Sequence, residues 1–159
     1  VYSATVNEFA PLGVEDSIVN TVSVTGGGLA APVTATETIN ASTTPQLSIS
    51  KSICPSTIAE NGTLTYTLTL QNRGNTAADA SDELVITDTF DPILKDLSVS
   101  FNGTVWTEGV HYTYDAATGA FATVTGALTV PAATYTQDTA TGVYTVDPGV
   151  SNLVITGTL

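Results

Sequence analysis

The sequence predicts an all-β fold, an immunoglobulin-like β-sandwich, and three observations lead to this prediction. Threonine, alanine, valine and glycine dominate the composition, and methionine is absent. Long helix-forming stretches rich in Leu, Lys and Glu are missing. Short segments of alternating apolar and polar residues recur along the chain, and turns containing Gly, Asn or Pro separate them.

Length and charge limit the classes of partner. The chain has 159 residues, enough for one sizeable domain or one domain with appended strands. Its net charge is −12, and its only Lys and Arg residues are Lys51, Lys95 and Arg73, which argues against nucleic acid or an anionic membrane as partner. No segment approaches the roughly twenty consecutive apolar residues of a membrane-spanning helix, so we expect no membrane insertion. Because the chain begins at Val1 without a methionine, we expect a piece of a longer precursor.

The first forty residues read as a few strands followed by a linker. Residues 1–6 alternate as a short strand, and residues 7–13 form a loop. Strand 18–24 ends at a glycine triplet, residues 26–28, and residues 32–39 form the next strand. Residues 40–45 have the small, polar composition of a linker with a stiffening proline. We therefore divide the chain into a segment 1–39, a linker 40–45 and a β-sandwich body 46–159.

The strand at 46–53 places a lysine on an apolar face. Alternation puts Lys51 on the same face as Leu47, Ile49 and Ile53, and we expect that face to be buried. An unpaired ammonium in a core costs several kcal/mol, so Lys51 needs a partner. In strand 84–90 the face with Leu84, Ile86 and Phe90 also holds Asp88, and in strand 18–24 the face with Ile18, Val22 and Val24 also holds Asn20.

These three side chains allow two interpretations, which the strands alone do not separate. In the first, the amine of Lys51 attacks the carboxamide of Asn20 while Asp88 acts as the acid, so that ammonia leaves and an isopeptide bond joins two strands. In the second, Lys51 and Asp88 form an ordinary buried ion pair, and Asn20 bonds to backbone. The first is a single-use cross-link rather than turnover. Because phosphate-loop, hydrolase-triad and dinucleotide motifs are absent, we do not expect an enzyme.

The rest of the chain continues the pattern of strands and turns. Residues 63–70 form the clearest strand, with Leu64, Tyr66, Leu68 and Leu70 on its inner face. Strand 97–101 turns at Asn102-Gly103 into 104–106. Two similar hairpins, 112–121 and 135–144, each carry an Asp-x-x-Thr-Gly turn, and a strand at 151–159 ends the chain.

The remaining reactive residue types give no metal or cofactor site. His111 has no second histidine or cysteine nearby, and the acidic residues 79–83 lack the spacing of a calcium loop. We expect Cys54 to be a half-buried apolar side chain rather than a nucleophile. We expect the aromatic residues of the hairpins to form cross-strand pairs. The alternative is an exposed patch around Trp106, Tyr114 and Tyr144 that binds a glycan or another surface ligand.

The stretch 47–88 resembles the conserved-repeat family of bacterial surface proteins (domain of unknown function eleven). The motifs that carry the resemblance are Lys51-Ser52 with Pro55, and the segments 62–68, 71–78 and 85–90. Repeats of this family are similar to the isopeptide-bonded domains of adhesins and pilins. The resemblance therefore implies an extracellular location at the bacterial cell surface.

One departure from the family concerns order. Such a repeat ends with a strand of the type Ile-x-Asn-Thr-x-x-Val, followed by glycines and Pro-Val-Thr, and here that ending lies at residues 18–34. The body 46–159 then stops one strand short of a closed sandwich. We expect a neighbouring copy to donate its strand 18–24, giving a head-to-tail homopolymer. The alternative is a stalk or adhesin module, in which residues 1–39 fold back and the isopeptide bond forms within one chain.

Overall fold

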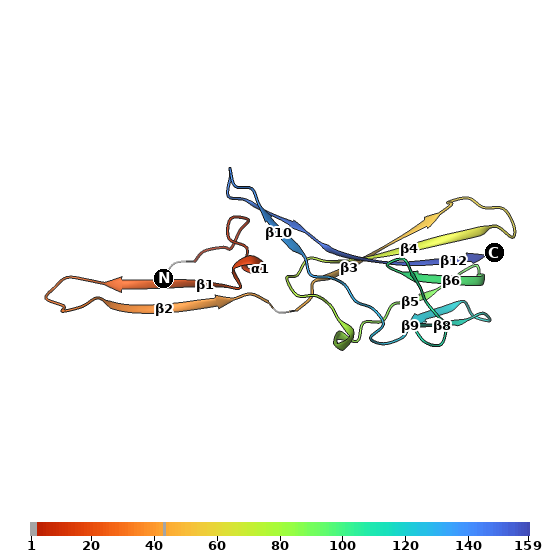
Figure 1. Ribbon diagram of the computed structural model, residues 1–159, viewed down its shortest axis with the longest axis horizontal. Coiled ribbons are helices and arrows are strands. Elements are labelled where there is room, and N and C mark those ends of the chain that lie inside the picture. The colour runs from red at the N-terminus through yellow and green to blue at the C-terminus, as the bar shows by residue number, and fades with distance from the viewer. Residues whose placement is uncertain (1–2, 43) are drawn as a thin grey trace. The chain divides into compact units, whose positions relative to one another are not determined.

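The computed structural model describes residues 3–42 and 44–159. Strands make up 49% of the chain and helices 3%, which confirms the all-β prediction, and the several sheets are consistent with a β-sandwich. The chain forms two compact units, Val1–Thr43 with Tyr135–Asp147 and Thr44–Thr134 with Pro148–Leu159 (Figure 1). The segment 135–147, expected in the body 46–159, thus belongs to the first unit.

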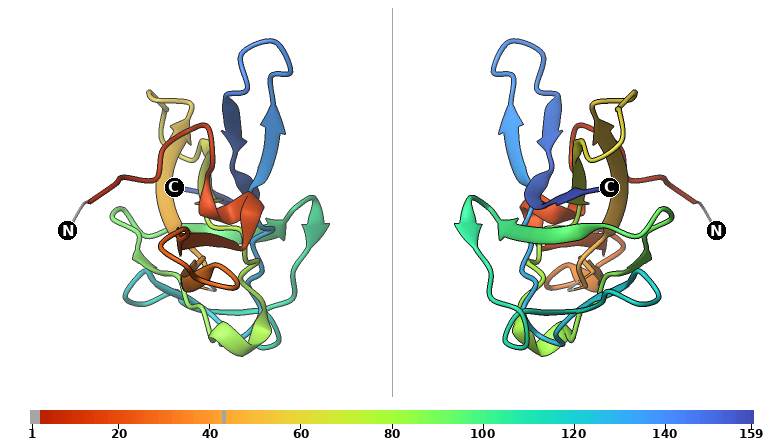
Figure 2. Two further views of the ribbon diagram at one scale, coloured as in Figure 1. Left: turned by 90° about the vertical axis from the view of Figure 1, so that its left-hand side faces the viewer. Right: turned by 90° about the vertical axis from the view of Figure 1, so that its right-hand side faces the viewer.

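The first unit contains two small sheets. The short helix α1 (Leu12–Glu15) precedes β1 (Ser17–Val24), which pairs with β2 (Val33–Asn40) as an antiparallel hairpin. The glycines 26–28 in the connection all have positive φ, a conformation that glycine adopts without steric cost. A second hairpin consists of β10 (Thr134–Gln137) and β11 (Tyr144–Asp147), which lie side by side in blue in Figure 2.

One predicted strand of this unit is absent. Residues 3–6 have no regular secondary structure, and residues 1 and 2 lie outside the described part of the chain. Alternation alone does not make a strand, because an isolated extended segment leaves its backbone N–H and C=O groups without a ladder. The sheets of the first unit pair β1 with β2 and β10 with β11, and neither includes residues 3–6.

The second unit contains a five-stranded and a three-stranded sheet. The first has the order β3-β4-β12-β6-β7 and the second the order β5-β9-β8. A 3₁₀ turn, η1 (Ala80–Asp82), precedes β5. The bounds of the eight strands are β3 Leu47–Cys54, β4 Thr63–Asn72, β5 Thr87–Thr89, β6 Lys95–Phe101, β7 Thr104–Val105, β8 Tyr112–Asp115, β9 Ala120–Thr123 and β12 Gly149–Thr158. The predicted turn at Asn102-Gly103 is confirmed, with positive φ at both residues.

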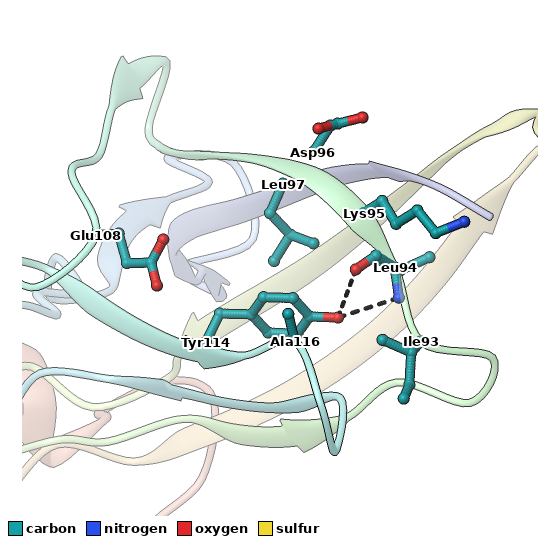
Figure 3. Close-up of a pocket in the computed structure, with 8 residues that line it drawn as sticks. All are labelled: Ile93, Leu94, Lys95, Asp96, Leu97, Glu108, Tyr114 and Ala116. Atoms are coloured by element: carbon teal, nitrogen blue, oxygen red, sulfur yellow. Dashed lines mark hydrogen bonds between the residues drawn. The ribbon is translucent and has the colours of Figure 1, made fainter.

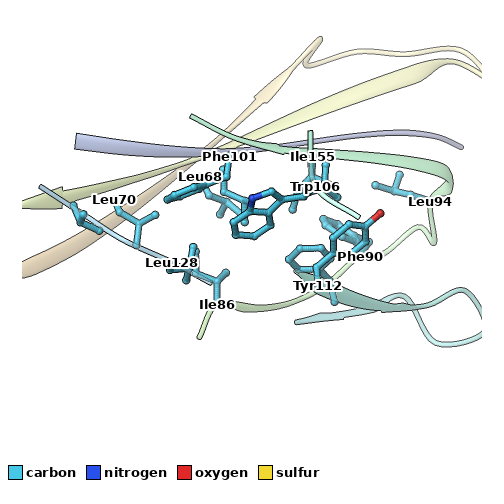
Figure 4. Close-up of a cluster of buried hydrophobic side chains, with 14 of the residues drawn as sticks. Leu68, Leu70, Ile86, Phe90, Leu94, Phe101, Trp106, Tyr112, Leu128 and Ile155 are labelled. Atoms are coloured by element: carbon cyan, nitrogen blue, oxygen red, sulfur yellow. The ribbon is translucent and has the colours of Figure 1, made fainter. Parts of the chain in front are cut away.

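Side chains from both sheets of the second unit form one hydrophobic core (Figure 4). The inner face of β4 is buried at Leu64, Leu68 and Leu70, as alternation predicts, and Tyr66 is half-buried. The central strand β12 contributes Leu153 and Ile155, which are fully buried. The other side of the core includes Ile86, Phe90, Tyr112, Phe121 and Leu128. Every second side chain of these strands points inward, and the inward-facing side chains of the two sheets pack against each other.

The two Asp-x-x-Thr-Gly turns fold alike, as predicted. In each, the glycine N–H donates to the aspartate C=O, over 2.8 Å in the first turn and 2.7 Å in the second. The hydroxyl of Thr118 and the N–H of Ala117 donate to the Asp115 carboxylate and lower its pKa. Asp138 has a lowered pKa for the same reason, because Ala140 N–H and Thr141 bond to its carboxylate. Both turns are therefore tightened by ionised aspartate.

A buried asparagine connects three segments of the second unit. Asn72, at the end of β4, is fully buried. Its Oδ1 accepts from the N–H groups of Gln46 and Gly74, each over 2.9 Å. Its Nδ2 donates to the carbonyls of Thr76 and Pro131, over 2.7 and 3.1 Å. The side chain thus satisfies four backbone groups at once.

Asn72→Ala should lower the free energy of unfolding by about 3 kcal/mol, because it leaves four backbone groups, one buried and three partly buried, without their partner. Urea denaturation measures the change. The control is Gln71→Ala, at the neighbouring position on the outer face of β4, which should change stability by less than about 0.5 kcal/mol. Equal effects from the two variants would contradict the role assigned to Asn72.

Candidate cross-link site

Lys51 of β3 and Asp88 of β5 form an ion pair. The distance from Lys51 Nζ to Asp88 Oδ2 is 2.5 Å. The other carboxylate oxygen, Oδ1, accepts from the N–H of Thr89 over 2.9 Å. Aromatic rings lie below the ammonium, with Nζ 4.7 Å from the centroid of Tyr66 and 5.5 Å from that of Phe90. Cation–π attraction thus adds to the ion pair in holding the lysine over the edge of the core.

The prediction that this face of β3 is buried is wrong for the chain in this structure. Every residue of β3 is exposed, including Ile49 at 55% and Ile53 at 44%, and the side chain of Lys51 is 41% exposed. The physical reason is the place of β3 at the edge of its sheet. β3 pairs with β4 only, and the facing sheet ends at β5.

The prediction of a buried face is closer to the structure for the segment 84–90, which carries Asp88. Ile86 and Phe90 are buried, and Leu84 is half-buried. Asp88 alternates with them, and its side chain is 18% exposed. The regular strand β5 is shorter than the predicted 84–90, since only residues 87–89 pair with β9. The lysine and carboxylate are thus brought together at the open margin of the two sheets rather than inside the core.

A groove runs between these two margins. A cavity of about 220 Å³ lies between Leu47 and Ile49 of β3 and the segment 84–86 that leads into β5, with Leu70 and Leu128 at its base. Val85 at this margin is 47% exposed. Among the described residues, no strand pairs with the outer edge of β3 or of β5. We call this cavity, together with the adjoining Lys51–Asp88 pair that lies outside its lining, the acceptor groove.

Asn20, the third predicted residue, belongs to the first unit. It lies on β1 opposite Glu37 of β2, and both side chains are exposed. The predicted donor residues Val22 and Val24 on the same face are 60% and 59% exposed, and Ile18 is half-buried. The second unit by itself therefore brings together two of the three predicted residues, Lys51 and Asp88.

The sequence did not predict that Glu37 lies opposite Asn20. It occupies the alternate position shared with Val33, Ala35 and Ile39, so its strand offered the same signal as those of Lys51, Asp88 and Asn20. Its place opposite Asn20 depends on the register across the β1–β2 connection, which contains three glycines in a row. The register became known only from the structure.

The aromatic residues Trp106, Tyr114 and Tyr144, considered above as a ligand-binding patch, are buried or half-buried. Trp106 is buried at 7% exposure and stacks on His111 with ring centroids 5.4 Å apart. Tyr114 and Tyr144 are half-buried. The hydroxyl of Tyr114 donates to the carbonyl of Leu94 over 2.7 Å and accepts from its N–H over 3.0 Å, beside a cavity of about 680 Å³ (Figure 3). Trp106 therefore belongs to the core, which contradicts the alternative of an exposed patch around it.

Other candidate sites give little chemistry. Cys54 is exposed, not half-buried as expected, because it ends the edge strand β3. Asp79 and Asp82 form a capping box on η1, and hydrogen bonds from Ser81 lower the pKa of Asp79. In the described part of the chain, no three His, Cys, Asp or Glu residues are grouped to hold a metal ion. No helix in that part is long and apolar enough to cross a membrane.

Comparisons with family models, curated proteins and solved structures find no match to this chain. The resemblance to the conserved-repeat family stays a prediction from the quoted motifs.

The Lys51–Asp88 pair should contribute little to the stability of the dilute, monomeric protein. Because Lys51 is 41% exposed, solvent screens the pair, and a double-mutant cycle with Lys51→Met and Asp88→Asn should give a coupling below about 1 kcal/mol. The cycle is measured by urea unfolding in a chain that also carries Asn20→Ala. A coupling of about 3 kcal/mol or more would mean that the pair is buried in the monomer.

Proposed function

We propose that this chain is a structural subunit of an extracellular fibre at the bacterial cell surface. Subunits join head to tail when the hairpin strand β1 of one copy enters the acceptor groove of the next and completes its immunoglobulin-like sandwich. A spontaneous Lys51–Asn20 isopeptide bond between copies then locks each junction. The observation that carries the proposal is the pair of complementary exposed features, an acceptor groove and an apolar hairpin face, in one chain.

The acceptor side offers both backbone and side-chain contacts. An added strand can pair with the outer edge of β3 or β5, which no strand of the described chain occupies. Its alternate side chains can contact Leu47, Ile49 and Val85, which are 38%, 55% and 47% exposed. Exposed edges of this kind favour association with another chain unless they are covered.

The donor side has two different faces. On β1 the face of Ile18, Asn20, Val22 and Val24 is apolar apart from Asn20, and on β2 the opposite residues include Val33 and Ile39. The other face is rich in threonine, and the hydroxyls of Thr21 and Thr36 lie 3.0 Å apart across the two strands. An exposed, amphipathic two-stranded sheet is marginally stable alone, which supports a role in which a partner covers its apolar face.

The cross-link follows from what insertion brings to the groove. Lys51 and Asp88 form an ion pair at the open margin of the two sheets. A β1 strand that enters the acceptor groove carries Asn20 in the middle of its apolar face. Covering the groove excludes water from the reacting groups, and once a carboxylate has taken a proton from the ammonium, the free amine is the nucleophile. One amide forms per junction, so the reaction has a single turnover.

The boiled, reduced protein should give a ladder of multimers on denaturing gels, each lighter than the sum of its chains by one ammonia per junction. Lys51→Ala and Asn20→Ala should each abolish the ladder, whereas Lys95→Ala, which removes a different exposed lysine, should leave it unchanged. Intact mass of every band is the measurement. A single band lighter by one ammonia would place the bond within one chain and favour a stalk module, and an unchanged mass would refute the cross-link.

Strand donation should depend on one face of each strand. Val22→Asp on β1 and Ile49→Asp on β3 put a charge on the donor and acceptor faces, and both should abolish multimers in sedimentation velocity without unfolding the chain, since both side chains are at least half exposed.

The matched controls place the same charge on the opposite faces. Thr21→Asp and Ser50→Asp lie at adjacent positions of the same two strands, where alternation points the side chain away from the proposed contact. Multimers should persist in both controls. Assembly that tolerates Val22→Asp and Ile49→Asp would rule out strand donation through these faces.

A further inference from the structure

Asn20 and Glu37 line the same pocket in the first unit. The pocket has a volume of about 460 Å³, and its walls include Ile18 and Ile39 of the hairpin and Val6 of the N-terminal segment. Asn20 and Glu37 are direct cross-strand partners in the antiparallel register. Side chains at such positions start from Cβ atoms about 4.5–5.5 Å apart, so a carboxylate can reach the carboxamide opposite it.

We propose that this pocket receives the Lys51 side chain of the neighbouring copy, and that Glu37 is a catalytic residue that transfers protons during attack on Asn20. This inference rests on the proposed function and deepens it. It gives the two carboxylates separate tasks, with Asp88 as the residue that positions Lys51.

The acceptor-side contacts support this division. Both oxygens of Asp88 are already engaged, Oδ2 by Lys51 Nζ and Oδ1 by the N–H of Thr89. Asp88 is therefore arranged to hold the lysine in place. Glu37 lies on the same strand pair as the carboxamide that must lose its nitrogen. A proton carrier is most effective within hydrogen-bond reach of the atoms that exchange the proton.

The chemistry of the pocket suits a lysine. Apolar walls from Ile18, Ile39 and Val6 can pack along its four-carbon stem, and Glu37 supplies the opposite charge for its ammonium. Cations are rare in this chain, with Lys51, Lys95 and Arg73 the only Lys and Arg residues. Of these three, Lys51 is the one that lies in the acceptor groove.

The proton balance needs no outside reagent. Lys51 enters as an ammonium and gives one proton to the Glu37 carboxylate, and the free amine then attacks Cγ of Asn20. Glu37 returns that proton to the Asn20 nitrogen, which leaves as ammonia when the C–N bond breaks. Of the other two lysine protons, one stays on the new amide and one departs with the ammonia as ammonium. The carboxylate is regenerated, and no atom is oxidised or reduced.

The test compares the rate of ladder formation with the extent of non-covalent assembly. Glu37→Gln keeps the size of the side chain but removes its ability to accept a proton, and it should slow the ladder on the order of 100-fold. Multimers in sedimentation velocity before boiling should persist, because the apolar faces of the hairpin and of β3 are intact in this variant. Glu37→Asp, which retains a carboxylate on a shorter stem, should give an intermediate rate. Glu8→Gln makes the same charge change outside the hairpin in the first unit and should match the unsubstituted chain.

The outcomes separate the two proposals. A slow ladder with normal multimers in Glu37→Gln supports a catalytic role for Glu37. A ladder as fast as that of the unsubstituted chain overturns it while leaving the fibre proposal standing. Loss of both ladder and multimers would show that Glu37 serves assembly rather than proton transfer. If the unsubstituted chain forms no ladder, the cross-link itself is refuted and the role of Glu37 with it.

Discussion

The structure depends on a simple constraint, that an apolar strand face is unfavourable in water and an unpaired strand edge attracts another strand. Most of the second unit meets this constraint within itself, because β12 pairs on both sides and the inner faces of β4 and β12 meet the opposite sheet. β3 does not. Its apolar residues Leu47, Ile49 and Ile53 remain exposed, and its outer edge has no strand paired with it in the described chain. The acceptor groove is the part of the second unit where an apolar face and a strand edge stay uncovered.

The β1–β2 hairpin in the first unit also has an exposed apolar face. Val22, Val24, Val33 and Ile39 are each about 60% exposed on one face of a two-stranded sheet. The chain thus has two uncovered apolar faces, one on β3 and one on the β1–β2 hairpin, and each also carries polar side chains. A single explanation, that the two faces cover each other, accounts for both. The hairpin face carries a carboxamide and a carboxylate, Asn20 and Glu37, and the groove carries an amine and a carboxylate, Lys51 and Asp88. Association would then bury apolar surface worth roughly 25 cal/mol per Å² and bring these groups together.

The sequence predicts what is local in this fold and not what is global. Alternation identified the inner face of β4 and the strand β12, and the Asp-x-x-Thr-Gly motif identified both hairpin turns, because these features depend on neighbouring residues only. Alternation also placed Lys51 and Asp88 on apolar faces. It could not tell whether another element covers a given face, and so the burial of β3 was predicted wrongly. The register that sets Glu37 opposite Asn20 was equally out of reach, since it depends on the geometry of a flexible glycine connection.

The central place of β12 has a consequence for how the second unit folds. Its residue Thr156 bonds through the side chain to Thr65, 91 positions earlier in the sequence, over 3.1 Å. β4 and β6 are joined to each other only through β12, so the five-stranded sheet cannot form before β12 is in place. Contacts of such long sequence separation slow folding, because a large loop must close first. Before β12 pairs with β4, the β3–β4 hairpin exposes the apolar face of β4 as well as that of β3. The incompletely folded chain is most prone to aggregate at this stage.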